Sequence, residues 1–379
     1  MDPRVWDAME PYFRHEFGNP HSKDHAYGWA AAQAVEKACE QVARSIGADP
    51  DEIIFTSGAT EANNLALLGI ARRATGGKRR RVLVSAIEHK SILAVSRVLE
   101  EQLDCVVERL PVDVEGRVDI AELNRRLGAD VLLVSIMSVN NEIGTIQSLE
   151  QISRVVRPSG ALLHSDGAHA PVATNIKRFS EFVDLLSLSA HKMYGPKGIG
   201  ALFVQRRLHG SLEPLIYGGE QQRSLRAGTL PAALCVGMGA AIEILDEGDT
   251  GRAEQRELWR KRSSLVRSLE DLPVGISLNG PQHEGSVHPG NLNVSFEGIQ
   301  AQDLLACLQP MLAASTGSAC TSGMNEPSHV LQATGLPRQR VDSSVRFSFG
   351  RFTTDQELDQ AAELVRHAVV SICSRTVLS

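Results

Sequence analysis

The sequence predicts an α/β protein with a mainly parallel sheet, because short apolar runs alternate along the chain with longer segments of helical periodicity. Its 379 residues, 42% of them apolar and 22% charged, can bury a large core and form two subdomains. The alternation predicts helices on both faces of the sheet. Buried strands are expected at 53–55, 82–84, 131–136, 161–163, 185–188 and 201–204.

Helices are expected where apolar residues recur every three or four positions, as they do over 26–46, 91–103 and 149–157. A helix of small residues at 230–245 is followed by the polar stretch 246–251, which marks a boundary. We assign residues 15–246 to a large domain, and 1–14 with 247–379 to a small α/β domain. The small domain is expected to contain a charged helix at 252–269, strands at 292–296 and 345–349, and a last helix at 355–372.

Charge and composition exclude several classes of protein. The net charge of -6 and the pI near 6.1 give no electrostatic basis for direct nucleic-acid binding, and we interpret the basic run 78–81 as a solvated loop that enters a strand. No apolar run reaches the roughly 18 residues of a membrane span. Six scattered cysteines, without a C-x-x-C pair or a secretory leader, favour a reducing, cytoplasmic location.

The stretch 187–200 places Lys192 at a strand end, inside a loop rich in glycine, proline and hydroxyl groups. A lysine held in this way is a candidate for a Schiff base with pyridoxal 5'-phosphate (PLP). The alternative is a solvated lysine in a surface turn, which is the commoner state of lysine.

Two further segments favour the cofactor. The run 161–166 is a short strand that ends in Asp166, and a PLP enzyme uses a carboxylate to keep the pyridine nitrogen protonated. The segment 55–64 passes from a strand through small residues into a helix, and its N–H groups and hydroxyls suit a phosphate, although a plain capping turn would look similar.

Cys320 lies among Ser, Thr, Gly and Ala in a segment without apolar periodicity, which is typical of a loop. A loop thiol can reach a substrate sulfur atom and carry it outward. The other five cysteines lie in helical or strand patterns and are expected to be structural. The string His164, Asp166 and His169 contains metal-ligand types, but His169 lies past a turn, so we expect no metal site.

Together with 85–91, 138–144 and 315–323, these segments follow the order and approximate spacing of one family. The chain resembles the NifS/IscS-like cysteine desulfurases, which are PLP enzymes of the class V aminotransferase family, over nearly its whole length. The resemblance implies a type I PLP-transferase fold with a seven-stranded, mainly parallel sheet, helices on both faces and a smaller α/β C-terminal domain. It also implies a homodimer.

The resemblance implies a role for each matching residue. Cys320, Lys192 and His89 would be catalytic: Cys320 would take the sulfur of L-cysteine as a persulfide and release L-alanine, Lys192 would bind PLP covalently, and His89 would stack on its ring. Asp166 would hold the pyridine nitrogen. Further cofactor contacts would come from Ala59, Thr60, Ser189, His191, Asn141 and, across the dimer, Thr229. Asn141 and Arg346 would bind the substrate carboxylate.

The sequence departs from the family at three places. His169 stands where the family has a glutamine that donates to the PLP phenolic oxygen, and we expect a neutral His169 to bind the cofactor there by donating from one ring nitrogen. Residues 218–223 replace Gly-Gly-Gly-Gln-Glu-Arg with Gly-Gly-Glu-Gln-Gln-Arg, and the usual Leu-Asp-x-x-Ala-Thr-Thr segment does not precede Asp2. Two alternatives therefore stay open: another PLP-dependent lyase or aminotransferase, and a partner-binding homologue without turnover. An active desulfurase is expected to pass sulfur to an acceptor protein, a scaffold or a thiolation enzyme, which the sequence does not identify.

Overall fold

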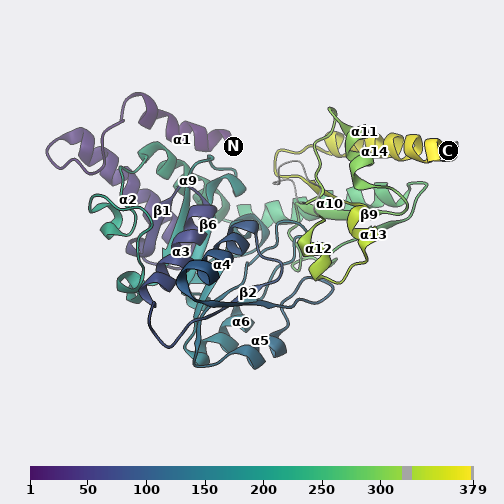
Figure 1. Ribbon diagram of the computed structural model, residues 1–379. Helices are drawn as coiled ribbons and strands as arrows, with labels where there is room; N and C mark the ends of the chain where they lie inside the picture. Colours follow the sequence, from purple (N-terminus) through teal and green to yellow (C-terminus); the bar gives the residue numbers. More distant parts are fainter. Residues whose placement is uncertain (318–326, 377–379) are drawn as a thin grey trace. The chain divides into compact units, whose positions relative to one another are not determined.

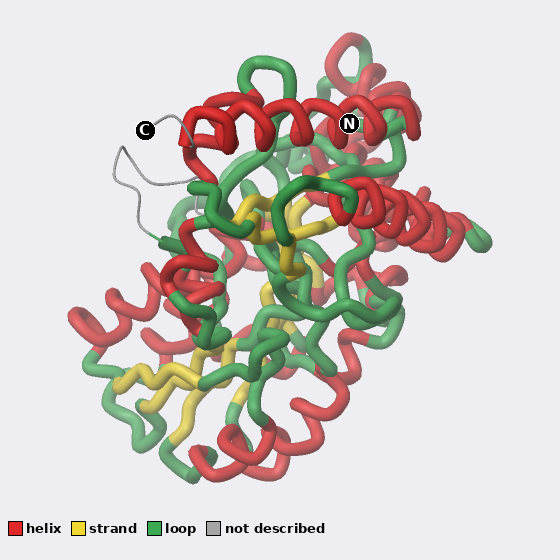
Figure 2. The backbone as a smooth tube through the Cα atoms, turned by 90° about the vertical axis from the view of Figure 1, so that its right-hand side faces the viewer, coloured by secondary structure: helices red, strands yellow, loops and turns green. Residues whose placement is uncertain are grey.

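A computed structural model of the protein describes residues 1–317 and 327–376. These residues form two compact units. The first comprises Met1–Leu110, Asp119–Val139 and Ser148–Gly251, and the second comprises Pro111–Val118, Asn140–Gln147 and Arg252–Ser379. Figure 2 shows the strands gathered into sheets with helices packed around them.

The first unit contains a seven-stranded sheet in the order β1-β7-β6-β5-β4-β2-β3. Strands β2 to β6 run parallel to one another, whereas β7 is antiparallel to both β6 and β1. The predicted seven-stranded, mainly parallel sheet is confirmed. The strands are β1 (Ile53–Thr56), β2 (Arg81–Ser85), β3 (Val106–Leu110), β4 (Val131–Ser135), β5 (Leu162–Asp166), β6 (Leu185–Ser189) and β7 (Gly200–Val204).

Helices cover this sheet, as the alternating pattern predicts (Figure 1). The face of the sheet that presents Val82, Val84, Leu202 and Val204 forms one buried core with the helices α3 and α4. Since side chains alternate along a strand, Leu83 and Phe203 point to the opposite face, where they are also buried. The helices are α1 (Pro3–Arg14), α2 (Ala26–Ile46), α3 (Ala59–Arg73), α4 (Lys90–Leu103), α5 (Ile120–Arg126), α6 (Leu149–Val156), α7 (Ala170–Ala173), α8 (Phe179–Phe182) and α9 (Ala232–Asp246).

Short 3₁₀ turns connect several of these elements. They are η1 (Pro50–Glu52), η2 (Arg157–Ser159), η3 (Ala190–Lys192), η4 (Arg206–Ser211) and η5 (Gln221–Ser224).

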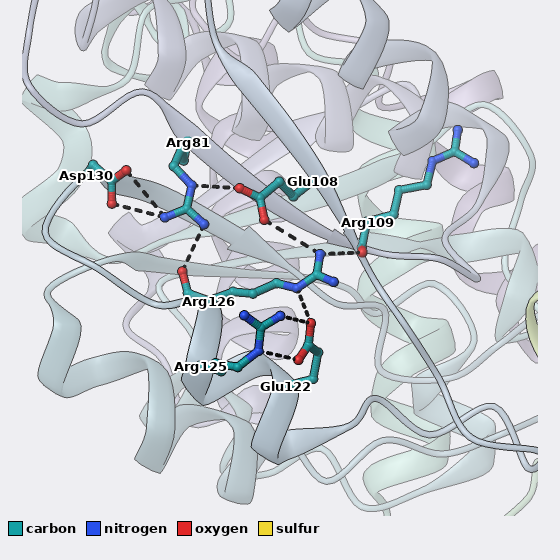
Figure 3. Close-up of polar contacts among 7 residues, drawn as sticks. All are labelled: Arg81, Glu108, Arg109, Glu122, Arg125, Arg126 and Asp130. Carbon is teal, nitrogen blue, oxygen red and sulfur yellow. Dashed lines mark hydrogen bonds and ion pairs between the residues drawn. The ribbon is translucent and has the colours of Figure 1, made fainter.

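The edge strand β3 was not predicted from the sequence. It contains Glu108 and Arg109, and only its last residue, Leu110, is buried, so it lacks the apolar run of a central strand. Arg81 of β2 donates hydrogen bonds to Glu108, Asp130 and the carbonyl of Arg126, at 2.8, 3.1 and 3.0 Å (Figure 3). Hydrogen bonds between polar side chains, rather than burial of apolar ones, therefore stabilise this edge of the sheet.

The arginines of the basic run 78–81 have their partners in the same region of the first unit. Arg79 donates to the carbonyls of Val131 and Ser159, and Arg80 forms an ion pair with Asp104. Three arginines of the run thus have partners within the first unit, and Arg81 begins strand β2, as the predicted entry into a strand requires.

The second unit contains an antiparallel sheet in the order β10-β9-β8 with its own apolar core. Phe296 and Phe347 meet edge to face in this core, with ring centroids 6.5 Å apart. The short strand β8, only partly buried, was not predicted. The elements are α10 (Thr250–Glu270), β8 (Ile276–Leu278), β9 (Asn291–Phe296), α11 (Ala301–Leu308), α12 (His329–Ala333), α13 (Arg338–Asp342), β10 (Ser344–Ser348) and α14 (Asp355–Thr376).

The division of the chain differs from the expected domains at its N-terminus and at two inner segments, 111–118 and 140–147, which belong to the second unit rather than to the large domain. Residues 1–14 were assigned to the small domain, but α1 packs against α9 within the first unit, and Val5 and Met9 are buried there. The backbone N–H of Asp2 donates to the carbonyl of Tyr194 at 2.9 Å. Sequence periodicity shows that α1 has an apolar face but not which neighbour covers it.

Candidate functional site

The candidate residues of the first unit follow the carboxyl ends of three strands in one parallel set (Figure 1). His89 comes four residues after β2, and Asp166 is the last residue of β5. Ser189 ends β6, and His191 and Lys192 lie in the turn η3 directly after it. Since the carboxyl ends of parallel strands meet at one edge, the fold gathers these side chains where α/β proteins bind ligands.

The turn that carries Lys192 is fixed on both sides. Ala190 and Met193 are fully buried, and the carbonyl of Ala190 accepts hydrogen bonds from the N–H groups of Met193 and Gly195 at 3.0 and 2.8 Å. A Cβ on Gly195 would lie 2.8 Å from that carbonyl oxygen, so the turn requires glycine. Lys192 itself is exposed, and its amine is presented from a rigid backbone.

Asp166 is buried, and both of its carboxylate oxygens have donors. The N–H of Ala168 donates to Oδ1 at 3.0 Å, and the side-chain amide of Asn63 donates to Oδ2 at 2.7 Å. These two bonds set the plane of the carboxylate. An oriented carboxylate at this position is suited to a protonated ring nitrogen.

A second buried carboxyl group, Glu88, lies near Asp166. Burial, and then the negative charge of Asp166, raise the pKa of Glu88 well above its ordinary value. Its Oε1 accepts the N–H of Met137 at 2.6 Å. Burial therefore favours the neutral, protonated form of Glu88.

The N-terminus of α3 and the end of β6 supply groups that suit a phosphate. Helix α3 begins at Ala59, after Gly58, which has no side chain to cap it, and Thr60 is exposed in the first turn. The hydroxyl of Ser189 lies 3.0 Å from Nδ1 of His191. Burial and the charges of Lys192 and Lys197 lower the pKa of His191, which favours a neutral ring.

Thr229 is exposed on the loop that follows η5. Arg226 on the same loop donates to Glu61 of α3 at 2.9 Å, which ties the loop to the helix that carries Thr60. His169 is half-buried at the N-cap of the short helix α7. Its predicted bond to the cofactor stays a prediction.

In the second unit the structure brings Asn141 and Arg346 together. Nη1 of Arg346 and Nδ2 of Asn291 donate to the backbone carbonyl of Asn141, at 2.9 and 3.2 Å. The backbone of Arg346 also pairs with Ser315 in both directions. Cys320 lies outside the described residues.

The metal alternative finds no support at His164. The ring is fully buried between two serine hydroxyls, with Nδ1 2.9 Å from Ser135 and Nε2 3.1 Å from Ser187. Burial lowers its pKa to about 3, so it is a neutral core residue. Among the described residues, no group of three or more His, Cys, Asp or Glu side chains is arranged to hold a metal ion.

The cysteines outside the candidate site differ in burial. Burial raises the pKa of Cys39 to about 12 and raises the pKa values of Cys105 and Cys235, so these thiols are poor nucleophiles. Cys373 is half-buried and Cys307 is exposed on α11.

Sequence reasoning missed Asn63, Ser91 and Glu88 as members of the site. Each lies inside one of the segments discussed above. Only Asn63 has a further sequence signal, because it is a polar residue on the apolar face of a helix, between Ala62 and Leu65. Their partners are distant in the chain and could not be read from spacing.

Comparisons with known proteins agree with this geometry. The fold and the groups at its strand ends define a PLP-dependent transferase of type I, and the family model "Aminotransferase class-V" matches residues 1–361. The chain belongs to this family. It is 42% identical to the cysteine desulfurase IscS of Rickettsia felis, over 96% of this chain and 87% of that protein.

Two solved structures are similar as well. A NifS-like protein superimposes with a TM-score of 0.89 at 33% identity, over 98% of this chain and 96% of the other. The protein SspA in complex with cysteine gives a TM-score of 0.80 at 32% identity, over 93% and 97%.

The groups of the first unit fit PLP, the cofactor of this family. An oriented carboxylate, a lysine amine on a fixed turn, an imidazole, and a helix N-terminus near hydroxyl groups match, in turn, the pyridinium, the aldehyde, the ring face and the phosphate of the cofactor.

Proposed function

We propose that this protein is a PLP-dependent cysteine desulfurase that converts L-cysteine to L-alanine and leaves the sulfur as a persulfide on Cys320. The observation that carries the proposal is the placement of Asp166 at the end of β5 and of Lys192 in the turn after the neighbouring parallel strand β6. Similarity to named cysteine desulfurases, and to a protein solved with cysteine, supports this choice of substrate.

PLP, when bound, withdraws electrons from the substrate's α-carbon. Lys192 would hold the cofactor covalently, and its amine, when free, would move a proton at the substrate's α-carbon. Asp166 binds the pyridine nitrogen, His89 stacks on the ring, and His169 donates to the phenolic oxygen. Ala59, Thr60, Ser189 and His191 bind the phosphate, with Asn141 as a further cofactor contact.

The side chains of Asn141 and Arg346 bind the substrate carboxylate in this proposal. The thiolate of Cys320 attacks the substrate sulfur, and a new S–S bond forms while the bond between that sulfur and the substrate's β-carbon breaks. The electron pair of the broken bond passes to the substrate carbon, which takes up a proton and leaves as alanine.

We also propose that the protein is a homodimer, in which Thr229 of one subunit contacts the phosphate site of the other. Its exposure in the single chain supports this role. Large apolar side chains are also exposed around α1 and α2, where a second copy would cover them: Trp6, Phe13, Phe17, Tyr27 and Trp29. A mass near twice 41.0 kDa by light scattering is expected, and a monomeric mass would contradict the dimer.

The acceptor of the sulfur is proposed to be another protein, either a scaffold or a thiolation enzyme. Among the described residues, no helix has the length and apolarity that a membrane crossing requires. The cytoplasmic location remains a prediction.

The purified protein should show a visible cofactor band and release equal amounts of alanine and persulfide sulfur from L-cysteine. Cys320→Ser should keep the band and lose persulfide formation, whereas Lys192→Ala should lose covalent attachment of the cofactor. A band without sulfur release would favour another PLP lyase or aminotransferase, and a protein that takes up no PLP would favour the non-enzymatic alternative.

A further inference from the structure

Asn63 is a polar residue in an apolar environment. It lies on α3 between Ala62 and Leu65, is completely buried, and belongs to the helix that packs on the sheet beside the main core. Burying an amide costs free energy unless hydrogen bonds compensate for the lost water. The contacts of this side chain therefore indicate what it does.

Both protons of the Asn63 side-chain amide are used. Nδ2 donates to Oδ2 of Asp166 at 2.7 Å and to the hydroxyl of Ser91 at 3.0 Å. A flipped amide would place its oxygen against the carboxylate, so the orientation of the group is fixed. Its oxygen, Oδ1, is buried without a hydrogen-bond partner in the described part of the chain. The residue is thus held through its donors alone.

Ser91 extends this network to His89. The hydroxyl of Ser91 lies 2.8 Å from Nδ1 of His89, and the backbone N–H of Ser91 donates to the same nitrogen at 3.1 Å. A backbone N–H can only donate, so Nδ1 has a lone pair and the hydroxyl of Ser91 must donate to it as well. The proton of the neutral ring is consequently on Nε2.

We propose that Asn63 is a positioning residue that couples two groups expected to contact the cofactor, Asp166 at the ring nitrogen and His89 on the ring face. Through one proton it fixes the carboxylate of Asp166, and through the other it orients the hydroxyl of Ser91, which in turn sets the tautomer and plane of His89. This inference rests on the proposed function, since it assigns Asp166 and His89 to PLP.

The test compares Asn63→Ala, Ser91→Ala and the double variant with Ser96→Ala. Ser96 is a matched control, because it is also a buried serine of α4 but its hydroxyl donates only to the carbonyl of Ile92. The readouts are the dissociation constant of PLP from the apoprotein and the pH midpoint of the visible cofactor band. Neither requires turnover.

Loss of charge-assisted and network hydrogen bonds of this kind predicts roughly tenfold weaker PLP binding for Asn63→Ala, and a smaller loss for Ser91→Ala with a shifted pH midpoint. The double variant should lose less than the product of the two single losses, because the two residues act in one network. Ser96→Ala should stay within about twofold of the wild type.

If Asn63→Ala does not fold, Ser91→Ala and Ser91→Thr decide the question, since threonine keeps the hydroxyl and should restore both readouts. Losses in Ser91→Ala no larger than those in Ser96→Ala, or fully multiplicative losses in the double variant, would overturn the positioning role. A wild-type protein that takes up no PLP would instead overturn the proposed function.

Discussion

The hydroxyl of Ser328 donates a hydrogen bond of 2.5 Å to the carboxylate of Glu142, which also lies against Gly317. Gly317 and Ser328 lie on either side of the segment 318–326, which contains Cys320. One carboxylate thus contacts the chain on both sides of this segment.

Gly317→Ala should destabilise the protein more than Gly298→Ala does. Both glycines have positive φ, +89° and +74°, and a left-handed alanine costs about 1–2 kcal/mol. A Cβ on Gly317 would also lie 2.5 Å from Glu142, whereas a Cβ on Gly298 would have no atom within 4 Å. Urea unfolding measures both, and equal losses would show that the contact with Glu142 does not constrain Gly317.

Glu88→Gln should flatten the dependence of stability on pH between about pH 5 and 8. The raised pKa keeps Glu88 protonated in the folded protein, while the unfolded chain releases this proton above its ordinary value of 4.5. Wild-type stability therefore falls as pH rises, and glutamine removes this contribution. The free energy of unfolding at several pH values is the measurement.

Glu61→Gln is the matched control with the opposite sign. Burial raises the pKa of Glu61, but hydrogen bonds from Arg226 and Ser57 outweigh it and lower the pKa overall. Glu61 therefore contributes stability above pH 4.5 that is lost on acidification, and its replacement should reduce the loss of stability below that pH. Parallel curves for Glu88→Gln and the wild type would contradict a neutral Glu88.

His164→Gln should make the protein less sensitive to acid. The pKa of His164 is lowered to about 3, so between its ordinary value of 6.5 and that value the unfolded chain binds a proton that the folded protein does not. This difference costs about 1.4 kcal/mol of stability for each pH unit below 6.5. Urea unfolding at pH 7 and 5 tests it. The same substitution at the exposed His283 should keep the wild-type dependence.

Arg81→Gln should cost more stability than Arg154→Gln. Arg81 is half-buried and donates to three different acceptors, so its replacement is expected to cost about 1–3 kcal/mol of stability (Figure 3). Arg154 forms an exposed pair with Glu150 within one helix, and such pairs contribute about 0.3–0.5 kcal/mol. Thermal unfolding of both variants gives the comparison. Similar losses of stability would mean that the network at β3 contributes no more than an exposed ion pair.

His169→Gln should keep activity and flatten the pH dependence of the cofactor band between about pH 6 and 8, because histidine titrates near neutral pH and glutamine does not. The prediction assumes that His169 donates to the phenolic oxygen of PLP. Absorbance titrations of the two proteins measure it. Identical titration curves would exclude this contact, and a loss of stability without a spectral change would indicate a structural role.

Local sequence patterns determined much of this protein. Apolar runs and helical spacing located the central strands and the long helices, and the composition around Lys192 and Asp166 was sufficient to suggest a cofactor. These features depend on residues within a few positions of one another, so they can be predicted from hydrophobic periodicity and from the residues that form turns. The edge strand β3 could not be predicted in this way, because an exposed strand lacks the apolar pattern of a buried one.

Only the tertiary structure decided which distant residues meet. Asp166 lies 103 positions from Asn63, and Ser91 lies 28 positions from it, yet the three share one hydrogen-bond network. The partners of the basic run 78–81 and the neighbour of α1 were settled in the same way. The physical reason is that the type of a residue and its neighbours in the sequence determine its hydrogen-bond donors and its tendency to be buried. Its partners depend on how whole strands and helices pack together.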